Sequence, residues 1–397
     1  MGRKCSERQK RMIFEEVKKY KEELIRVRRY LHQYPEESMK EYETAAYVRD
    51  YLTKHDIPWI EAGETGTVAI IQGSREGPII GLRGDIDALV MAELKTCDYA
   101  SKKPGLMHAC GHDAHTGALL GAAVYLNEHK DELPGTVKLI FQPGEENGRG
   151  AKSVVDSGAV NDVEGIFALH VANSLPIGNV TIRKGVMSSA NDKFRIWIHG
   201  VGCHGSTPQK GADALLAGAN LATTLQSLIS RESDPLKPSV MTVGILQSGT
   251  AFNILPEEAY LEGSIRTLDE AQREVNRETV RRMAECTAAA YKCTATTEFE
   301  ATAKVVYNDE HLTDLAIRSA EKILGKEHVL EQELSMGAED FAEFLAVAPV
   351  TYMNIGSRNE EKGITAPHHH GEFDIDEDCL PICMAMYVQF VYEYFNI

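Results

Sequence analysis

The chain lacks long apolar stretches, and its basic side chains are outnumbered by acidic ones. No run of about 18 uncharged apolar residues occurs, which excludes a typical membrane-spanning helix. The 59 Asp and Glu against 42 Lys and Arg give a formal net charge of −17. This charge disfavours binding to nucleic acid or to an anionic membrane, although a local Arg or metal ion can still make one pocket attract an anion. Because Met1–Arg11 is basic and polar, without an apolar signal core, we expect a cytoplasmic protein.

The sequence also lacks CxxC pairs, internal repeats and low-complexity tracts. Its eight cysteines are scattered, and a chain of 397 residues needs no disulfide framework. We expect most of them to be small buried side chains, and only Cys110 has neighbours typical of a metal site. With 43% hydrophobic and 25% charged residues, the composition is that of a soluble globular protein, and the length favours two or three domains.

Strands and helices alternate along the first half of the chain. Apolar spacing predicts helices at 7–32, 44–55 and 116–128, and strands at 67–71, 78–83, 136–141 and 166–170. This alternation predicts an α/β sheet domain. Polar side chains follow the predicted strand ends, which is where α/β sheets bind their ligands.

The middle of the chain has a different pattern. Strands are predicted at 193–199, 239–247, 257–266 and 293–300, and helices at 212–230 and 268–291. Their order, β-α-β-β-α-β, is that of a ferredoxin-like α+β unit. The α/β pattern then resumes, with helices predicted at 309–324, 338–345 and 376–395 and a strand at 350–355. We therefore predict one α/β domain formed by 1–185 and 300–397, interrupted by a separate domain at 186–299.

The segment Met107–His115 places a thiol, three imidazoles and a carboxylate within nine residues. Cys110 and His112 are two residues apart on a predicted loop before a helix, so both side chains can face one ion. Thiolate and imidazole are good ligands for zinc and its transition-metal neighbours. Alone, the pair fits an inert buried cysteine beside a surface histidine equally well; the donor clusters elsewhere in the chain favour the metal site.

Further donors follow at separate places. Glu145 and Glu146 come after a strand and a Pro-Gly turn, where one can face a metal and the other its water. The pair can instead be a solvated surface feature. His170 closes a predicted apolar strand, a position more typical of a core histidine, and 368–370 can be a polar loop of three histidines. Asp85 and Asp87 follow another strand, where they can bind a metal, orient its imidazole ligands or simply form a turn.

Seven motifs in this order resemble peptidase family M20. They resemble in particular its amidohydrolase branch, which includes hippurate hydrolases, auxin-conjugate hydrolases and N-acyl-amino-acid deacylases. The motifs cover nearly the whole chain: LRGDIDAL at 82–89, MHACGHD at 107–113, FQPGEE at 141–146, LH at 169–170, GVGCHGSTP at 200–208, MGAEDF at 336–341 and HHGEFD at 369–374.

The resemblance implies a metal-dependent exopeptidase-like catalytic domain and, at 186–299, an inserted lid and dimerisation domain. It implies two divalent metal ions per subunit, drawn from Zn, Mn, Co or Ni. The implied ligands are Cys110 as the bridge, His112, Glu146, His170 and His369. His369 is preferred because it lies four residues before Phe373, as the motif requires, and its neighbours His368 and His370 are the alternatives.

The resemblance also assigns catalytic and binding roles. Glu145 would be the general base, and His204 would stabilise the oxyanion, in its own subunit or across a dimer. Asn253 and Arg266 would hold the substrate carboxylate. The remaining implied residues support the ligands from behind: Asp85, Asp87, Asp113 and His115.

Three positions depart from the family pattern. Gly144 stands where Ala is usual, Val90 where Pro is usual, and Cys203 where Gly is more frequent, and the segment 90–99 diverges. None removes a ligand or the base, so these departures concern substrate identity. The leading hypothesis is hydrolysis of the amide bond of a small N-acyl amino acid. The alternatives are a dipeptidase or aminoacylase-like metallopeptidase with the same centre, and a metal-binding scaffold without catalysis.

Overall fold

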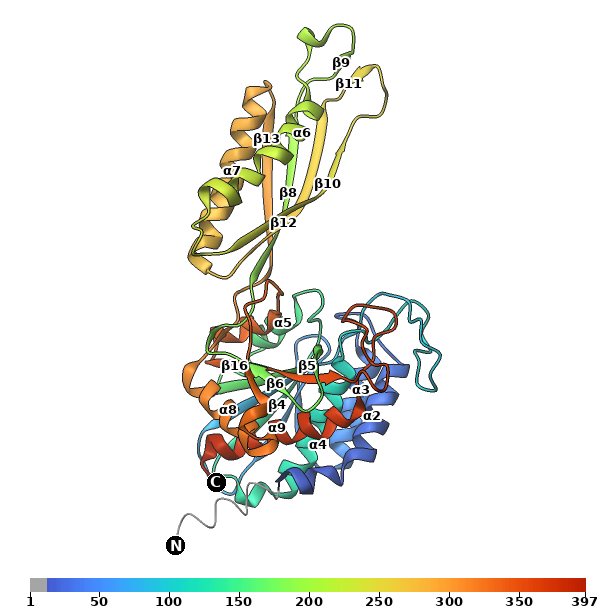
Figure 1. Cartoon of the computed structure of the whole chain (residues 1–397), viewed down its shortest axis with the longest axis vertical. Helices are drawn as coiled ribbons and strands as arrows, with labels where there is room; N and C mark the ends of the chain where they lie inside the picture. The colour runs from blue at the N-terminus through green and yellow to red at the C-terminus, as the bar shows by residue number, and fades with distance from the viewer. Residues whose placement is uncertain (1–12) are drawn as a thin grey trace. The chain divides into compact units, whose positions relative to one another are not determined.

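The computed structural model describes residues 13–397, which form two compact units (Figure 1). The first, here called the sheet unit, comprises the described residues up to Met187 together with Tyr307–Glu333 and Asp340–Ile397. The second, called the inserted unit, comprises Ser188–Val306 and the short return Leu334–Glu339. The part of the predicted helix 7–32 that precedes Ile13 lies outside the described residues. Within residues 13–397 no helix is long and apolar enough to span a bilayer.

The sheet unit is built on a ten-stranded mixed sheet whose main path runs β1-β2-β4-β3-β5-β16-β14-β7. Its central strands β4, β3, β5 and β16 are parallel, and β2 pairs antiparallel with β4. The strands of the main path are β1 (Trp59–Ala62), β2 (Gly66–Gln72), β3 (Ile79–Asp85), β4 (Thr136–Gln142), β5 (Gly165–Pro176), β7 (Gly185–Val186), β14 (Tyr307–Asn308) and β16 (Val350–Arg358). Two short strands, β6 (Val180–Ile182) and β15 (Val329–Glu331), pair with each other beside β16. The predicted α/β class is confirmed.

Helices cover this sheet, and the central one is almost wholly buried. The helices are α2 (Lys21–Gln33), α3 (Tyr42–Lys54), α4 (His112–Glu128), α5 (Gly150–Asp156), α8 (Glu310–Leu324) and α9 (Leu380–Phe395). Helix α4 packs against α2 and α9, which lie beside it (Figure 1). The close approach of α4 to α2 and α9 requires glycine at position 121. A Cβ on Gly121 would lie 2.6 Å from Leu24 Cδ2 of α2 and 2.9 Å from Met384 Sδ of α9. This packing fixes the N-terminus of α4.

Several predicted element bounds differ from the structure, and the helix predicted at 338–345 is a 3-10 helix over Asp340–Ala346. Three further differences have a local cause. Helix α4 begins at His112, four residues before the predicted start, because Gly111 adopts φ +91° and turns the chain directly into the helix. The strand predicted to end at His170 continues to Pro176, since β16 pairs with it along that length. The predicted first helix is interrupted at Lys19 and Tyr20, where the Tyr20 hydroxyl donates to Glu128.

The inserted unit contains a four-stranded antiparallel sheet in the order β10-β12-β8-β13. The strands are β8 (Ala190–His199), β10 (Ser239–Ser248), β12 (Glu258–Thr267) and β13 (Thr294–Ala303), with helices α6 (Ala214–Thr224) and α7 (Glu270–Ala290). Phe194, Ile196 and Ile198 alternate along β8 into the core under the helices. A β-α-β-β-α-β order with this sheet is the predicted ferredoxin-like arrangement. A small ladder of β9 (Cys203–His204) and β11 (Ile254–Leu255) extends one end.

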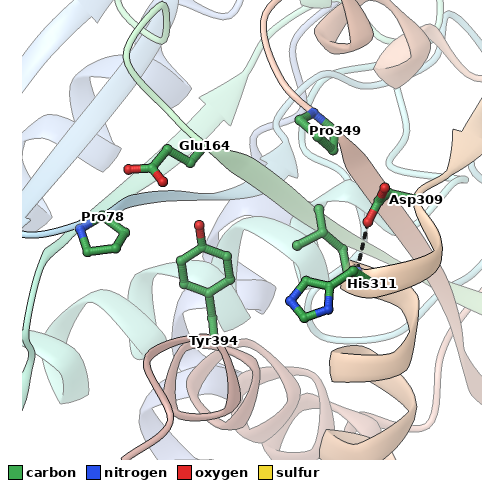
Figure 2. Close-up of a pocket in the computed structure, with 7 residues that line it drawn as sticks. Pro78, Glu164, Asp309, His311, Pro349 and Tyr394 are labelled. Atoms are coloured by element: carbon green, nitrogen blue, oxygen red, sulfur yellow. Dashed lines mark hydrogen bonds between the residues drawn. The ribbon is translucent and has the colours of Figure 1, made fainter.

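Different residues gather at the amino ends and at the carboxyl ends of the parallel strands. Pro78, Glu164 and Pro349 immediately precede β3, β5 and β16, and they line a cavity of about 330 Å³ (Figure 2). The remaining lining residues are Asp309, His311, Leu312 and Tyr394. This cavity lies at the amino ends of the strands. At the opposite end of the parallel strands, the predicted ligand Glu146 follows the carboxyl end of β4, and the predicted ligand His170 lies within β5.

Candidate metal centre

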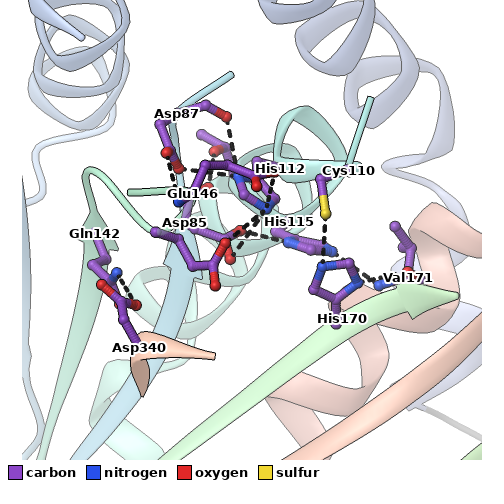
Figure 3. Close-up of polar contacts among 12 residues, drawn as sticks. Asp85, Asp87, Cys110, His112, His115, Gln142, Glu146, His170, Val171 and Asp340 are labelled. Atoms are coloured by element: carbon purple, nitrogen blue, oxygen red, sulfur yellow. Dashed lines mark hydrogen bonds and ion pairs between the residues drawn. The ribbon is translucent and has the colours of Figure 1, made fainter. Parts of the chain in front are cut away.

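Cys110, His112 and His170 meet where α4 begins beside β5. Gly111 allows this approach, because a Cβ on it would lie 2.3 Å from Val171 Cγ2 and its φ of +91° suits glycine. Cys110 Sγ lies 3.4 Å from His170 Nε2 (Figure 3). One donor atom from each of Cys110, His112 and His170 lies within 4.8 Å of the others. These three side chains can therefore face one ion.

The turn after β4 brings two carboxylates to the same place. His112 Nε2 lies 4.0 Å from Glu145 Oε2 and 4.0 Å from Glu146 Oε1. His369 Nε2 lies 3.4 Å from Glu146 Oε2. A second group of donors, Cys110, Glu146 and His369, also fits within 4.8 Å. The structure thus gathers all five predicted ligands and Glu145, and Cys110 belongs to both groups.

Hydrogen bonds behind the cluster orient its imidazoles. His112 Nδ1 donates to the backbone oxygen and to Oδ1 of Asp87, both at 3.0 Å, which leaves Nε2 for the cluster. Oδ2 of Asp87 accepts from Glu146 N at 3.0 Å. His170 Nδ1 donates to Val171 O at 2.6 Å, so its Nε2 faces Cys110. A second partner that fixes the tautomer is the usual arrangement of metal-binding histidines.

The other residues expected to support the ligands lie in two places. Asp85 Oδ1 accepts from His115 Nδ1 at 2.5 Å, and His115 Nε2 accepts from Val171 N at 2.9 Å. Both nitrogens of His115 are therefore engaged within the protein. Asp113, in contrast, faces away from the cluster, and its Oδ2 accepts from Arg28 Nε at 2.8 Å and from His32 Nδ1 at 2.7 Å.

The pKa values of three side chains in the cluster are strongly shifted. Burial, together with the charge of Glu146, raises the pKa of the Cys110 thiol well above its usual range. Burial opposes protonation of His112, but Asp85 and Cys110 raise the pKa of His112 well above its ordinary value. Burial and the neighbouring His115 and His368 lower the pKa of His170. Perturbed groups of this kind concentrate at functional sites.

The donor set fits a transition-metal site. His112 Nε2 and Glu146 Oε1 are buried, and neither makes a hydrogen bond. Buried polar atoms without partners are rare and costly, so these two atoms fit the ligands of a bound cation. A bound cation also removes the thiol proton, which reverses the raised pKa of Cys110. Sulfur, imidazole and carboxylate together suit zinc, manganese, cobalt or nickel better than calcium or magnesium.

Two of the three predicted functional residues of the inserted unit lie together, and the third lies apart from them. His204 pairs with Ile254 in the β9–β11 ladder, and Gly205 N donates to Asn253 O at 2.8 Å, so His204 and Asn253 lie together. Arg266 pairs with Asn191 at the other end of β12 and donates to Met336 O at 2.7 Å.

Several supporting residues are absent from the sequence predictions. Ser38 Oγ donates to Asp87 Oδ2 at 2.7 Å, and Glu41 Oε1 accepts from Gly144 N at 2.8 Å. Arg28 is fully buried and bonds to Asp113 and to Asp374 Oδ1, the latter at 2.8 Å. These residues precede the first strand in an ordinary polar segment, and no spacing or donor cluster marks them.

The similarity of this chain to known proteins is consistent with a metal centre of this kind. Residues 81–393 match the family model described as Peptidase family M20/M25/M40. The chain is 37% identical to thermostable carboxypeptidase 1 of Saccharolobus solfataricus over 92% of this chain and 94% of that protein. It is 37% identical to an N-acetyl-L-cysteine deacetylase of Bacillus subtilis, covering 94% of this chain and 87% of that one.

Its fold matches a solved Bacillus subtilis structure described as a dinuclear metal binding peptidase from the M20 family. That match has a TM-score of 0.84 and 32% identity, and it covers 96% of this chain and 99% of the other. The chain therefore belongs to peptidase family M20/M25/M40 and is a metal-dependent amidohydrolase of that family.

Proposed function

We propose that the protein hydrolyses small N-acyl amino acids to a carboxylate and a free amino acid. The observation that carries this proposal is the convergence of Cys110, Glu146, His112, His170 and His369 in overlapping donor groups, with Glu145 beside His112 and Glu146. The similarity to an N-acetyl-L-cysteine deacetylase supports an acyl amino acid as the substrate.

Two divalent metal ions would be held by the five gathered ligands. His112 and His170 would serve one ion, Glu146 and His369 the other, and Cys110 would bridge them, since it belongs to both donor groups. Zinc, manganese, cobalt and nickel all accept this donor set. When bound, such ions supply positive charge that polarises an amide carbonyl and makes water acidic enough to attack at neutral pH.

Glu145 is the proposed general base. Its Oε2 lies 4.0 Å from His112 Nε2, so the carboxylate borders the ligand cluster. In this role Glu145 accepts a proton from the attacking water and returns it to the amide nitrogen as the C–N bond breaks. One side chain therefore serves as base and then as acid, which contributes about 10²–10⁴-fold to the rate of such reactions.

The inserted unit is proposed to act as lid and dimerisation domain. Eight residue steps along β12 lead from Glu258 to Arg266, a span of roughly 27 Å in an extended strand. His204 and Asn253 lie beyond the Glu258 end. A small acyl amino acid cannot touch both ends of this sheet at once. We therefore propose a homodimer, in which His204 and Asn253 of one subunit and Arg266 of the other serve the same substrate.

Mixing of inactive subunits tests this arrangement. Glu145→Gln and His204→Ala homodimers are each expected to be inactive. After subunit exchange, half of the dimers are hybrids with one complete site, so roughly a quarter of wild-type activity should return. No recovery, although hybrids form, would contradict a site shared across the dimer.

The cytoplasmic location stays a prediction from the N-terminal sequence.

A peptidase is the second candidate, because a relative of the same identity is named a carboxypeptidase. The metal-loaded protein should be assayed on N-acetyl, N-benzoyl and longer-chain acyl amino acids beside dipeptides and short peptides, with chelator-treated protein as control. We expect the highest kcat/KM on the acyl amino acids. Higher values on peptides would favour the peptidase, and metal binding without turnover on any amide would favour a scaffold.

A further inference from the structure

The turn that carries Glu145 and Glu146 is held by the segment before α3. Glu41 is fully buried, and its Oε1 accepts from Gly144 N at 2.8 Å and from Met39 N at 2.7 Å. Its Oε2 accepts from Thr65 Oγ1 at 2.5 Å. One oxygen of Glu41 thus joins the backbone of Met39 to the backbone of Gly144, which lies 103 residues after Glu41 in sequence.

The two segments also meet where the Met39 side chain packs against the backbone of Gly144. Met39 and Gly144 both have left-handed backbones, with φ of +65° and +55°. A Cβ added to Gly144 would lie 2.4 Å from Met39 Sδ and 3.1 Å from Met39 Cγ. The family pattern leads one to expect Ala at this position, yet in this chain Met39 fills the space that an Ala methyl group would need.

The same segment reaches the turn at a second point. Ser38 Oγ donates to Asp87 Oδ2, which also accepts from Glu146 N. Gly144 N is fixed by Glu41 and Glu146 N by Asp87, so backbone groups on both sides of Glu145 are held. The Glu145 side chain therefore starts from a backbone position with little freedom.

We propose that Glu41 is a positioning residue for the general base Glu145, and that Met39 and Gly144 are a matched pair that sets the path of its turn. This inference rests on the proposed role of Glu145. A displacement of about 1 Å at a reacting group can cost about 100-fold in rate, so small shifts of this turn are measurable in kcat.

A double-mutant cycle tests the matched pair. Gly144→Ala should lower kcat by about 100-fold, and adding Met39→Ala should recover tenfold or more of that loss, because it vacates the contact. The left-handed backbone still disfavours Ala, so recovery stays incomplete. Gly178→Ala is the matched control, since Gly178 has φ +83° with nothing within 4 Å, and it should leave kcat unchanged. Equal kcat for Gly144→Ala with and without Met39→Ala would overturn the pairing.

A second set of variants tests Glu41 itself. Glu41→Gln keeps an oxygen acceptor for Gly144 N and should keep kcat within about fivefold of wild type, whereas Glu41→Leu should lower it about 100-fold. Thr65→Val removes only the donor to Oε2 and should resemble Glu41→Gln. Metal content and KM are measured in each variant, and a positioning role predicts the loss in kcat with both nearly constant. Equal kcat for Glu41→Leu and Glu41→Gln, or a loss that follows metal content alone, would overturn the proposal.

Glu145→Gln, measured in the same assay, separates the role of Glu145 as general base from the positioning role of Glu41. If it retains wild-type turnover, the proposed role of Glu145 as the general base fails, and the positioning proposal, which rests on that role, fails with it. If it is inactive while Met39→Ala does not relieve Gly144→Ala and Glu41→Leu keeps full kcat, the positioning proposal alone fails. Should Gly144→Ala not fold, the comparison of Glu41→Gln with Glu41→Leu still decides the role of Glu41.

Discussion

Asp87 should control metal affinity, because one carboxylate holds two proposed ligands. Its Oδ1 accepts from His112 Nδ1 at 3.0 Å, and its Oδ2 accepts from Glu146 N at 3.0 Å and from Ser38 Oγ at 2.7 Å. Asp87→Ala removes all three acceptor contacts. His112 keeps one partner, since Nδ1 also donates to the backbone oxygen of residue 87 at 3.0 Å. The imidazole tautomer is therefore retained, and the main loss is the position of Glu146.

Loss of a group that orients metal ligands typically lowers metal affinity or activity about 10- to 100-fold. Each tenfold step corresponds to about 1.4 kcal/mol in binding free energy. We expect Asp87→Ala to weaken metal binding by about 10- to 100-fold, and Asp87→Asn, which keeps one oxygen acceptor, to weaken it less.

A competition titration with a chromophoric chelator measures the affinity. Circular dichroism and the apo-protein melting curve show whether the fold is retained, and Asp50→Ala on the exposed face of α3 is the matched control. A folded Asp87→Ala protein whose metal affinity lies within about twofold of wild type would refute the orienting role.

Three further predictions concern the metal and the buried charges. Dialysis against a chelator should abolish turnover and lower the Tm, and zinc, manganese, cobalt or nickel should restore both; turnover by metal-free protein, verified by mass spectrometry, would contradict this. Arg28→Met should lower the free energy of unfolding in guanidinium chloride by about 3–5 kcal/mol, because it strands the buried carboxylate of Asp113; a loss below about 1 kcal/mol would show that the ion pair is dispensable. Burial alone raises the pKa of Asp374, but Arg28 and Lys95 hold it below its usual range. Its carboxylate therefore stabilises the fold fully above the unfolded pKa of about 3.9. This contribution is lost as the pH falls from about 4 through the lower folded pKa, so the Tm should fall over that range and fall less steeply in Arg28→Met.

The proposed ligands could be recognised from sequence because their donors cluster at predicted strand ends. Cys110, His112, Glu145 and Glu146 lie in two short polar segments that each follow or precede a regular apolar pattern. The helix start at His112 could not be predicted, because helical periodicity does not detect the left-handed Gly111. The length of β5 beyond His170 depends on pairing with β16, which is a tertiary effect.

The supporting residues Ser38 and Glu41 could not be recognised from sequence patterns. Ser38 lies 49 residues from Asp87, and Glu41 lies 103 residues from Gly144. Each is a common polar residue in a polar segment, so only the fold shows which backbone group it meets. The importance of Gly144 was also invisible, since it depends on the position of Met39 Sδ.

The most direct test of the central claim is the rate of N-acyl amino acid hydrolysis by Glu145→Gln with its metal content measured. Glu145 borders the ligand cluster but is not one of the five proposed ligands, so the variant should bind the same amount of metal as wild type. The account predicts full metal occupancy and a kcat reduced by about 10²–10⁴-fold. Wild-type kcat in the fully metal-loaded variant would contradict it.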